Sequence, residues 1–547
     1  MTATSRARWL GLAMLSVGVA MIIVDATIVN VAIPSIIDDL GIELVDAEWI
    51  NTIYSLVFAA LLITLGRIGD LFGRKRLFHA GLVTFVAASM LAGQAPTGGL
   101  LVAARSLQGV GAAMILPSTL SIVNASFQGR ERAIAFGIWG SVIGGMAALG
   151  PLLGGWLTTS YSWRWAFYIN VPVGALALIG SMTWVSDSRD EHAQRGFDPA
   201  GIAAISVGLS SLVFGLIEGA RYGWYEATRP FTVGDWTWSL GSVSIVPFAF
   251  ALAAVCLPLF FFVESRRAAA GRSVLFNLAL FRIKSFRYGN LTAATLSLGE
   301  LGMIFVLPLF LTAVLGYTAF QTGLLLLALA GGAFLGGPAA AVLAQRFGPR
   351  RVVTTGMLIE AIAIASIALL IDPVMTGTRL VPSLFVYGVG VGLATAQLTS
   401  VILVEVPPRH SGQASGMQST FRQIGSAFGI ALVGTVLATS LGTMSADRLT
   451  TVPGLPPQAI EGIAEAMKAS AGQIVDQVAD QAGSEQVVDV LRGVFVDSAK
   501  RAAPTAMAFV LLGFSLSWLL PETRHVVHEG AEPAHLPGRP TPESAGA

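Results

Sequence analysis

Long apolar runs separated by short polar loops dominate the pattern of hydrophobic and polar positions along the chain. A helix needs about 20 mostly apolar residues to cross the hydrocarbon layer of a bilayer. Fourteen runs reach this length, and we expect each to form a transmembrane helix. They are residues 9–33, 49–68, 77–95, 99–124, 133–157, 165–186, 198–219, 238–264, 287–314, 321–345, 352–372, 379–405, 414–441 and 502–520. The first run is too long for the hydrophobic region of a signal peptide, so it is expected to stay in the protein.

The composition agrees with a membrane protein that crosses the bilayer many times. Of the 547 residues, 54% are hydrophobic and 12% are charged, and the mean hydropathy is +0.71. Soluble proteins contain about 25% charged residues, so a single water-soluble domain is excluded. The net charge of +1 provides no general attraction for nucleic acid. A single cysteine, Cys256, excludes an intramolecular disulfide, and we expect neither a metal site nor a cofactor.

Positive charge is distributed unevenly between the two sides of the predicted membrane domain. If the N-terminus is cytoplasmic, the inner loops hold 18 Lys and Arg residues and the short outer loops hold 4. The first outer loop also carries five acidic residues and no basic one: Asp38, Asp39, Glu43, Asp46 and Glu48. Lys and Arg accumulate in cytoplasmic loops, so the pattern predicts that both termini are cytoplasmic.

One long polar segment, residues 442–501, is predicted to lie outside the membrane. Apolar residues recur at helical spacing on both sides of Gly483, which predicts an external helical hairpin. The hairpin either caps the surface as a spacer or takes part in gating or partner binding. Residues 522–547 are rich in proline and are expected to be a disordered cytoplasmic tail.

An internal repeat divides the membrane domain. The sequence IGDLFGRKR at 68–76 aligns with LAQRFGPRR at 343–351, each in the loop after the second helix of a bundle. Parallel repeats of six helices are typical of transporters with a central binding site. We therefore expect an all-α fold of two six-helix bundles. The predicted units are residues 1–186, two additional helices in 187–264, and a second bundle in 265–521 that includes the external hairpin.

Four segments combine charged residues or glycines with membrane-spanning helices. They read DATIVNVAIP at 25–34, GRIGDLFGRKR at 66–76, RSLQGVGA at 105–112 and GPLLGG at 150–155. Hydrocarbon surroundings disfavour the charged form of a carboxylate, so Asp25 is suited to taking up and releasing a proton. Arg105 needs a partner if it is buried, and Asp25 is a plausible one. Each residue also has a purely structural reading, in which it only bonds to a neighbouring helix.

Together these segments resemble the fourteen-helix drug:proton antiporter family of the major facilitator superfamily. The resemblance implies proton coupling for Asp25 and Arg105, and export rather than import. It also implies a latch of the outward-open state formed by Gly66, Asp70, Gly73 and Arg74, and an antiporter motif formed by Gly150, Pro151, Gly154 and Gly155. The alternatives are topological anchoring for the basic turn and simple packing for the glycines. Gln345 replaces the aspartate in the second copy of the turn, which predicts a weaker latch there.

Other polar residues within the predicted spans are candidates for substrate contact. Glu300 is the leading substrate or second proton site, because its helix lines the cavity in the superfamily arrangement. Gln397 offers a neutral hydrogen bond, and Arg422 is a candidate gate residue. Glu360 lies in a helix that is peripheral in the family, so a structural or lipid-edge role is expected for it.

The sequence therefore predicts a proton-coupled exporter of hydrophobic, cationic drugs or toxic compounds. The chain contains none of the zinc, phosphate-loop or nucleophile-elbow motifs of enzymes. The expected partners are a small hydrophobic substrate, protons and membrane lipids, with the protein acting as a monomer without nucleic acid. The resemblance implies a location in the bacterial inner membrane. Export of one endogenous metabolite, lipid or antibiotic is the alternative, and an importer, membrane enzyme or receptor is a weaker one.

Overall fold

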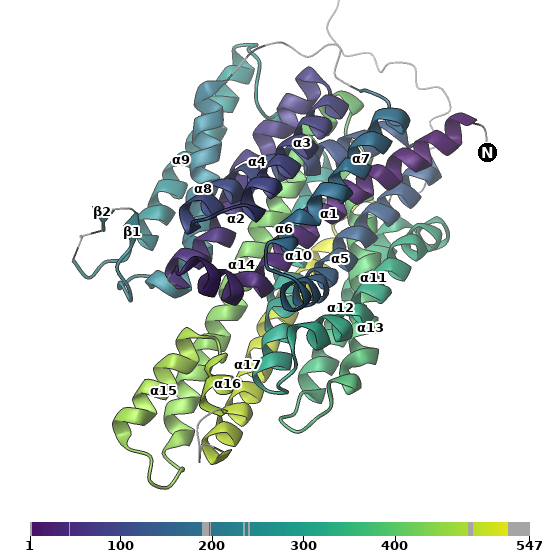
Figure 1. The fold of residues 1–547 in the computed structure, drawn as a ribbon. Coiled ribbons are helices and arrows are strands. Elements are labelled where there is room, and N and C mark those ends of the chain that lie inside the picture. The colour runs from purple at the N-terminus through teal and green to yellow at the C-terminus, as the bar shows by residue number, and fades with distance from the viewer. Residues whose placement is uncertain are drawn as a thin grey trace, which may run out of the picture.

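The computed structural model describes residues 3–42, 44–188, 196, 198–233, 236–238, 241–479 and 485–522. Helices make up nearly all of this part of the chain (Figure 1). The α-helices are α1 (Ala3–Leu40), α2 (Leu44–Phe72), α3 (Arg74–Gly93), α4 (Gly98–Ser126), α5 (Gly129–Ser160), α6 (Trp165–Tyr168), α7 (Asn170–Trp184), α8 (Pro199–Tyr222), α9 (Val246–Ala269), α10 (Lys284–Ala313), α11 (Ala319–Phe347), α12 (Pro349–Leu370), α13 (Val381–Val404), α14 (Ser411–Leu449), α15 (Pro457–Ala469), α16 (Ile474–Ala479) and α17 (Glu485–Ser517).

A few short elements connect them. Three 3₁₀ helices, η1 (Leu278–Arg282), η2 (Gly377–Leu380) and η3 (Pro408–His410), precede α10, α13 and α14. Strands β1 (Thr232–Val233) and β2 (Trp236–Thr237) form a small antiparallel pair between α8 and α9. The sequence analysis did not predict this ribbon. It directly precedes the predicted eighth span, 238–264, and the corresponding helix α9 begins at Val246 rather than at 238.

The chain is a multi-pass membrane protein. Twelve helices within the described residues are long and apolar enough to cross a membrane, or thirteen when the two arms of the bent α5 count as one span. Thirteen of the predicted spans coincide with these helices. The last predicted span, 502–520, falls in the C-terminal half of α17, a helix that begins in a charged segment. The count of fourteen and the cytoplasmic position of the termini stay predictions.

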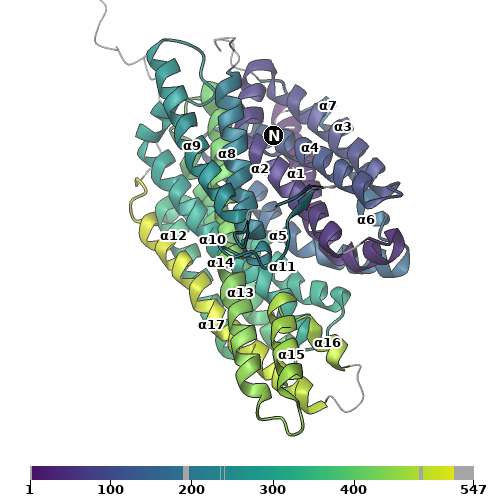
Figure 2. The same ribbon diagram turned by 90° about the vertical axis from the view of Figure 1, so that its left-hand side faces the viewer.

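Most of the long helices pack in two groups (Figures 1 and 2). Helices α1 to α5 and α7 contact one another, and helices α10 to α14 and α17 do the same. The groups meet mainly where α5 packs against α11 and where α2 packs against α14. Helices α8 and α9 pair with each other, and α8 also contacts α2 and α14. The two groups follow the two copies of the internal repeat.

Helix α9 shows why these helices belong in lipid. It exposes large apolar side chains every three to four residues, which places them on one face: Phe248, Leu252, Val255, Leu259 and Phe262. Monomeric water-soluble proteins rarely expose such a continuous apolar stripe. Hydrocarbon chains cover this face in a membrane.

The two copies of the repeat adopt the same local structure. Helix α2 ends at Phe72 and α3 begins at Arg74, while α11 ends at Phe347 and α12 begins at Pro349. The single residue between each pair is a glycine with positive φ, 112° at Gly73 and 87° at Gly348. A side chain would strain the backbone in this region, so glycine permits the abrupt reversal between two spans.

Residues 442–479 and 485–501 form a helical module that projects from the membrane domain (Figures 1 and 2). Its helices bury apolar side chains against each other, among them Met467, Val475, Leu491 and Phe495. Two of its pieces are continuations of α14 and α17 rather than a separate hairpin. The predicted apolar run ends at residue 441, whereas α14 continues to Leu449. Polar residues between Ser445 and Arg448 interrupt the hydrophobic pattern but do not end the helix. The break at Gly483 and most of the tail, 523–547, lie outside the described residues.

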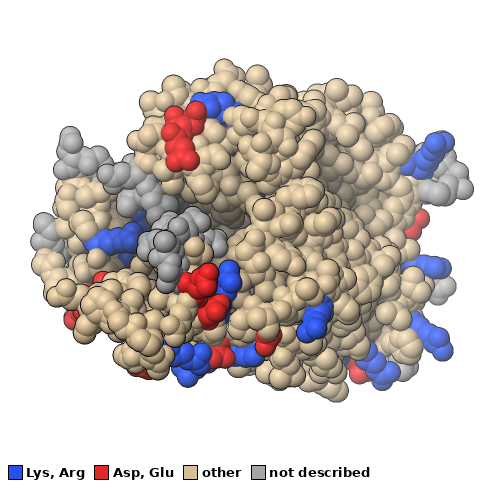
Figure 3. Space-filling model, turned by 60° about the horizontal axis from the view of Figure 1, so that its bottom comes forward, with Lys and Arg blue, Asp and Glu red and all other residues tan. Residues whose placement is uncertain are grey.

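The surface on the side of this module carries few charges. In Figure 3 most of it is tan, charged side chains form scattered groups, and the surface is hollowed near its middle.

Candidate functional site

Asp25 lies within α1 and is completely buried. Its Oδ2 accepts a hydrogen bond from Nη1 of Arg105 on α4 at 2.5 Å. Its Oδ1 accepts hydrogen bonds from Nε2 of Gln108 at 3.0 Å and from Nδ2 of Asn170 at 2.7 Å. These donors replace the water that the carboxylate loses on burial. The structure thus brings together the two ionisable residues, Asp25 and Arg105, that the sequence indicated as a pair.

The guanidinium of Arg105 is also fully buried. Its Nη1 donates to Oε1 of Gln108 at 2.9 Å, and its Nε donates to the backbone carbonyl of Ile50 at 3.1 Å. Its Cζ lies 4.3 Å from the centre of the Tyr54 ring, which is a cation–π contact. Nη2 has no hydrogen-bond partner among the described residues. One cation therefore balances one carboxylate while Asp25 is ionised.

Two further residues complete this arrangement. Ser89 on α3 accepts hydrogen bonds from Gln108 Nε2 at 2.8 Å and Asn170 Nδ2 at 3.2 Å, and donates to the carbonyl of Phe85. We call Asp25, Ser89, Arg105, Gln108 and Asn170 the Asp25 network. The sequence analysis missed Ser89 and Asn170, because a neutral polar residue in a span usually bonds only to its own or a neighbouring helix. Only the structure shows that the amide groups of Gln108 and Asn170 both donate to the Asp25 carboxylate.

The Asp25 network joins α1, α3, α4 and α7 through one titratable group. Protonation of Asp25 removes its negative charge and turns one acceptor oxygen into a donor. Arg105 then keeps its charge in a buried site without an anionic partner, which is costly. Binding or loss of one proton at Asp25 therefore changes the free energy of packing between α1 and α4.

A second group of ionisable residues lies among α10, α12, α13 and α14. Glu300 Oε2 is 3.9 Å from Nη2 of Arg422, a distance that permits an ion pair but not a hydrogen bond. The hydroxyl of Tyr387 donates to the backbone carbonyl of Glu300 at 3.1 Å. Glu360 interacts electrostatically with both Glu300 and Arg422. We call Glu300, Glu360, Tyr387 and Arg422 the Glu300 cluster.

The structure corrects the expectation for Glu360 and separates the other candidates. Glu360 is 0% exposed, so the expected lipid-edge position is wrong. Helix α12 turns this side chain into the protein, where it interacts electrostatically with Glu300 and Arg422. Gln397 is buried about 15 Å beyond Tyr387 along α13. Its Nε2 has no hydrogen-bond partner among the described residues, and it lies apart from the Glu300 cluster.

The predicted latch residues connect the two helix groups. Asp70 at the end of α2 accepts hydrogen bonds from the backbone N–H groups of Gly412 at 2.9 Å and Gln413 at 3.0 Å. These N–H groups belong to the first turn of α14, where the helix dipole favours a negative charge. Arg74 donates to Asp70 at 2.7 Å and to the carbonyl of Pro408 at 2.7 Å. The two side chains together bridge α2 and α14.

Glycines let α2 and α14 approach closely at this bridge. A Cβ added to Gly66 would lie 2.5 Å from the carbonyl oxygen of Gly412, closer than atoms can pack. In the second copy of the repeat, Gln345 donates to the carbonyl of Ala341 in its own helix. This local bond agrees with the weaker latch expected from the loss of the aspartate.

The glycines of the antiporter motif place α5 against two helices. Gly150 and Gly154 face α1, because an added Cβ would overlap the side chain of Thr27 and lie 2.9 Å from the carbonyl oxygen of Ile28. Gly155 faces α11 instead, with the backbone nitrogen of Phe320 2.9 Å from an added Cβ. Helix α5 thus contacts the helix that carries Asp25 on one side and the second helix group on the other.

Pro151 gives α5 a bend. The arms Gly129–Ala147 and Leu149–Ser160 differ in direction by 42°. Proline has no N–H group to bond to the carbonyl four residues earlier, and its ring crowds that carbonyl. That carbonyl belongs to Ala147, where the first arm ends. Pro151 therefore causes the bend, which lies where α5 packs against α1.

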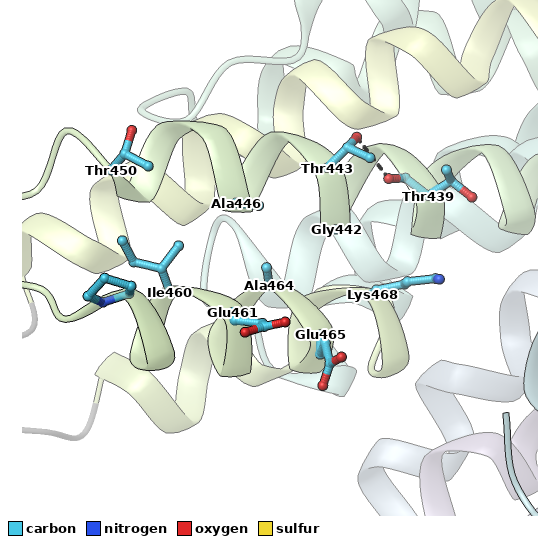
Figure 4. A pocket seen from close by; sticks show the side chains of 11 residues that line it. Thr439, Gly442, Thr443, Ala446, Thr450, Ile460, Glu461, Ala464, Glu465 and Lys468 are labelled. Atoms are coloured by element: carbon cyan, nitrogen blue, oxygen red, sulfur yellow. Dashed lines mark hydrogen bonds between the residues drawn. The ribbon is translucent and has the colours of Figure 1, made fainter.

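The projecting module contains a groove of about 610 Å³ between α14 and α15. Figure 4 shows small side chains of α14 along one wall and the acidic Glu461 and Glu465 on α15 near the rim. The remaining lining residues include Gly442, Thr443, Ile460 and Lys468. The groove shares no residue with the Asp25 network or the Glu300 cluster.

Residues 15–430 match the sequence profile of the Major Facilitator Superfamily. The chain is 32% identical over 467 residues to the tetracenomycin C resistance and export protein of Streptomyces glaucescens, covering 85% of this chain and 82% of that one. It is 32% identical over 513 residues to the multidrug efflux pump LfrA of Mycolicibacterium smegmatis, covering 93% and 95%. The multidrug resistance protein Stp of Mycobacterium tuberculosis is 32% identical over 435 residues, covering 79% and 76%.

The fold also resembles a solved transporter structure. The crystal structure of the human organic anion transporter MFSD10 superimposes with a TM-score of 0.57 at 13% sequence identity, covering 94% of this chain and 100% of that one. This likeness supports the fold alone, whereas the sequence matches extend across most of the chain. The arrangement of the helices, the Asp25 network and these matches lead to one identification: the chain belongs to the Major Facilitator Superfamily of membrane transporters, not to a family of enzymes.

Proposed function

We propose that this protein is a proton-coupled exporter of hydrophobic, cationic compounds across the bacterial cytoplasmic membrane. Its two helix groups, residues 1–186 and 265–521, rock against each other to expose a central site alternately to either side. Helices in 187–264 support this movement from the periphery. Proton entry from outside drives export, and no cofactor is required.

The observation that carries this proposal is the buried ion pair between Asp25 and Arg105, with its Oδ2 to Nη1 distance of 2.5 Å. Proton coupling needs a group whose ionisation alters helix packing. Asp25 meets this requirement because three side chains on α4 and α7 donate to its carboxylate. Each of these interactions is stronger with the ionised than with the protonated acid.

The latch supplies the second element of the cycle. Asp70 and Arg74 hold the ends of α2 and α14 together on the side predicted to be cytoplasmic. The surface on the opposite side is hollowed (Figure 3). This combination supports an outward-open arrangement, the state in which Asp25 would receive a proton from outside.

The relatives support export and leave two kinds of substrate. LfrA and Stp are named for efflux of, or resistance to, many drugs, whereas the Streptomyces glaucescens relative is named for one compound. The similarity to LfrA and Stp favours a broad range of hydrophobic cations as substrates. The similarity to the Streptomyces glaucescens protein favours a second candidate function, the export of one endogenous metabolite, lipid or antibiotic.

Transport into everted membrane vesicles tests the proposal. Vesicles that carry the protein and an imposed proton gradient, acidic inside, are expected to accumulate ethidium, and accumulation is expected to stop when the gradient is collapsed. Asp25→Asn is expected to abolish the gradient-driven part. The matched control is Asp39→Asn, which removes a carboxylate from the same helix where Asp39 is part-exposed beside Arg164, and should retain transport.

Each result has a distinct meaning. Full gradient-driven transport by Asp25→Asn would refute the assignment of coupling to the Asp25 network. If the wild-type protein moves no ethidium but a deletion strain accumulates one native compound, the second candidate function replaces the first.

A further inference from the structure

Helix α8, the first of the two additional helices, carries a buried carboxyl group that bonds to the first helix group. Glu218 lies one turn before the end of α8 and is 2% exposed. Its Oε1 accepts a hydrogen bond from the hydroxyl of Thr52 on α2 at 2.8 Å, and its Oε2 lies 3.3 Å from Nη1 of Arg221. Thr52 is buried as well. A hydroxyl group that donates to an ionised acceptor forms a strong bond, so this contact holds α2 and α8 together.

The rest of this contact is apolar. A cluster of small and aliphatic side chains fills the space where α2, α8 and α14 meet: Leu56, Ala59, Val213, Leu216, Ala427 and Ala431. Apolar contacts have no preferred direction and let helices rotate or slide, whereas one buried polar bond can fix a single register between helices. The bond between Glu218 and Thr52 therefore determines how α2 is rotated against α8.

The elements around Glu218 offer it few other charges. Helix α9 has no charged residue before Glu264, and α14 has none between Arg422 and Asp447. Arg221 thus supplies the positive charge beside Glu218. A carboxylate in an otherwise apolar contact costs free energy, and the position that it gives to α2 is a reason for its presence there.

Helix α2 carries the contact residues of Arg105 on its opposite face. Successive residues of an α-helix turn by about 100°, so Ile50 and Tyr54 share one face and Thr52 lies on the other. The carbonyl of Ile50 accepts from Nε of Arg105 at 3.1 Å, and the centre of the Tyr54 ring is 4.3 Å from its Cζ. Helix α2 is therefore held between Glu218 on one side and Arg105 on the other.

We propose that Glu218 is a positioning residue of the Asp25 network. Through Thr52 it sets the rotation of α2, and with it the two contacts that α2 makes with Arg105. These contacts matter most when Asp25 is protonated, because they still stabilise a cation that has lost its anionic partner. The additional helices thus help to set the free energy of proton binding at Asp25. This role rests on the proposed function, since only proton coupling makes that free energy matter for transport.

Infrared difference spectra between acidic and neutral solution test this role on the purified full-length protein in lipid nanodiscs, without a membrane gradient. The band of the protonated Asp25 carboxyl group is the one that Asp25→Asn removes. Thr52→Val keeps the shape of the side chain but not its hydroxyl, and is expected to move the midpoint of this band by about half a pH unit or more. Thr52→Ser retains the hydroxyl and is expected to keep the wild-type midpoint, which covers a packing defect in Thr52→Val.

A double variant tests whether the two residues act through one bond. Glu218→Met removes the carboxylate at similar length, and is expected to move the midpoint in the same direction as Thr52→Val. The double variant is expected to move it no further than the larger single change, because both substitutions remove the same bond. The matched control is Glu226→Gln, which removes an exposed carboxylate just beyond α8 and should leave the midpoint unchanged.

Transport in everted vesicles gives a second readout. Thr52→Val is expected to lower gradient-driven ethidium accumulation, relative to downhill ethidium movement without a gradient, by about threefold, the factor that corresponds to half a pH unit. A merely structural defect would lower both rates in proportion, because fewer transporters would be active.

Unchanged midpoints in folded Thr52→Val and Glu218→Met proteins would overturn the proposal. So would additive changes in the double variant, because the two residues would then act separately. If Thr52→Val moves the midpoint while Asp25→Asn keeps full gradient-driven transport, the positioning by Glu218 stands and the proposed function fails. The two failures are therefore distinguishable.

Discussion

Replacement of Asp70 by asparagine is expected to open the contact between α2 and α14. Asp70 is completely buried, and its two oxygens accept the N–H groups of Gly412 and Gln413 as well as the guanidinium of Arg74. An asparagine side chain has the same shape but only one acceptor oxygen, and its amide group would face a donor. The variant therefore loses at least one bond across the helix groups, and the bonds that remain lose their charge.

The size of the effect follows from these contacts. A hydrogen bond to a charged group contributes about 1.5–3 kcal/mol, and a buried donor left without a partner costs about 1–3 kcal/mol. We take about 3 kcal/mol as the stabilisation that the variant loses when α2 and α14 are in contact. This loss shifts the equilibrium between the closed and the open contact toward the open one by roughly 100-fold. A protein that is open about one part in a hundred would become about half open.

Distance measurement between two spin labels detects this shift. The background is Cys256→Ala, since Cys256 is the only native cysteine. Labels replace Phe72 at the end of α2, which is 63% exposed, and Arg409 in the exposed turn before α14. Electron–electron resonance in nanodiscs is expected to give mainly short distances for the background protein. A second, longer population is expected for Asp70→Asn.

The matched control is Asp187→Asn. Asp187 lies 3.8 Å from Arg76 near the same turn, and its side chain is 43% exposed. An exposed pair of this kind contributes about 0–1 kcal/mol, so its removal should leave the distances unchanged. Superimposable distance distributions for Asp70→Asn and the background protein would refute the argument that these bonds hold α2 to α14.

Three other substitutions probe separate features. Asn170→Leu removes one of the three donors to Asp25, a loss of about 1–3 kcal/mol, and is expected to reduce gradient-driven ethidium transport; transport at the wild-type rate would contradict a role for Asn170. Gly150→Ala forces a Cβ against Thr27 and is expected to destabilise the protein by about 1–3 kcal/mol, seen as a lower Tm, whereas Gly331→Ala on α11 meets no atom within 4 Å and should not. Gly348→Ala places a side chain at a φ of 87° and is expected to cost about 1–2 kcal/mol, so an unchanged Tm would show that the turn relaxes.

The sequence predicted those features that depend on local pattern. Apolar runs located thirteen spanning helices because hydrocarbon requires length and hydrophobicity, and the paired turns at Gly73 and Gly348 followed from a repeated motif. The pairing of Asp25 with Arg105 was expected because each needs the other's charge when buried. A charged residue buried in hydrocarbon needs a partner of opposite charge, so a single sequence can indicate that two such residues form a pair.

Features that depend on the rotation of helices could not be predicted. The sequence pattern did not show which way the Glu360 side chain points, because its helix is apolar on all sides, and a structural or lipid-edge role was expected. Asn170 and Ser89 were missed because neutral polar residues occur throughout membrane helices. Glu300 and Arg422 were each selected, but their proximity depends on how α10 packs against α14, which no local spacing records.

The continuity of α14 and α17 with the projecting module gives the protein a rigid handle outside its helix bundle. Most of a 57.1 kDa chain of this kind lies within lipid or detergent, where it offers little contrast for particle alignment in electron microscopy. A binding fragment attached to α15 would report the orientation of α10 to α14 and α17 directly, because two helices without a break connect it to them. The same rigidity means that a bulky fragment there would move with one half of the transporter, so the angle between fragment and membrane would record the transport cycle.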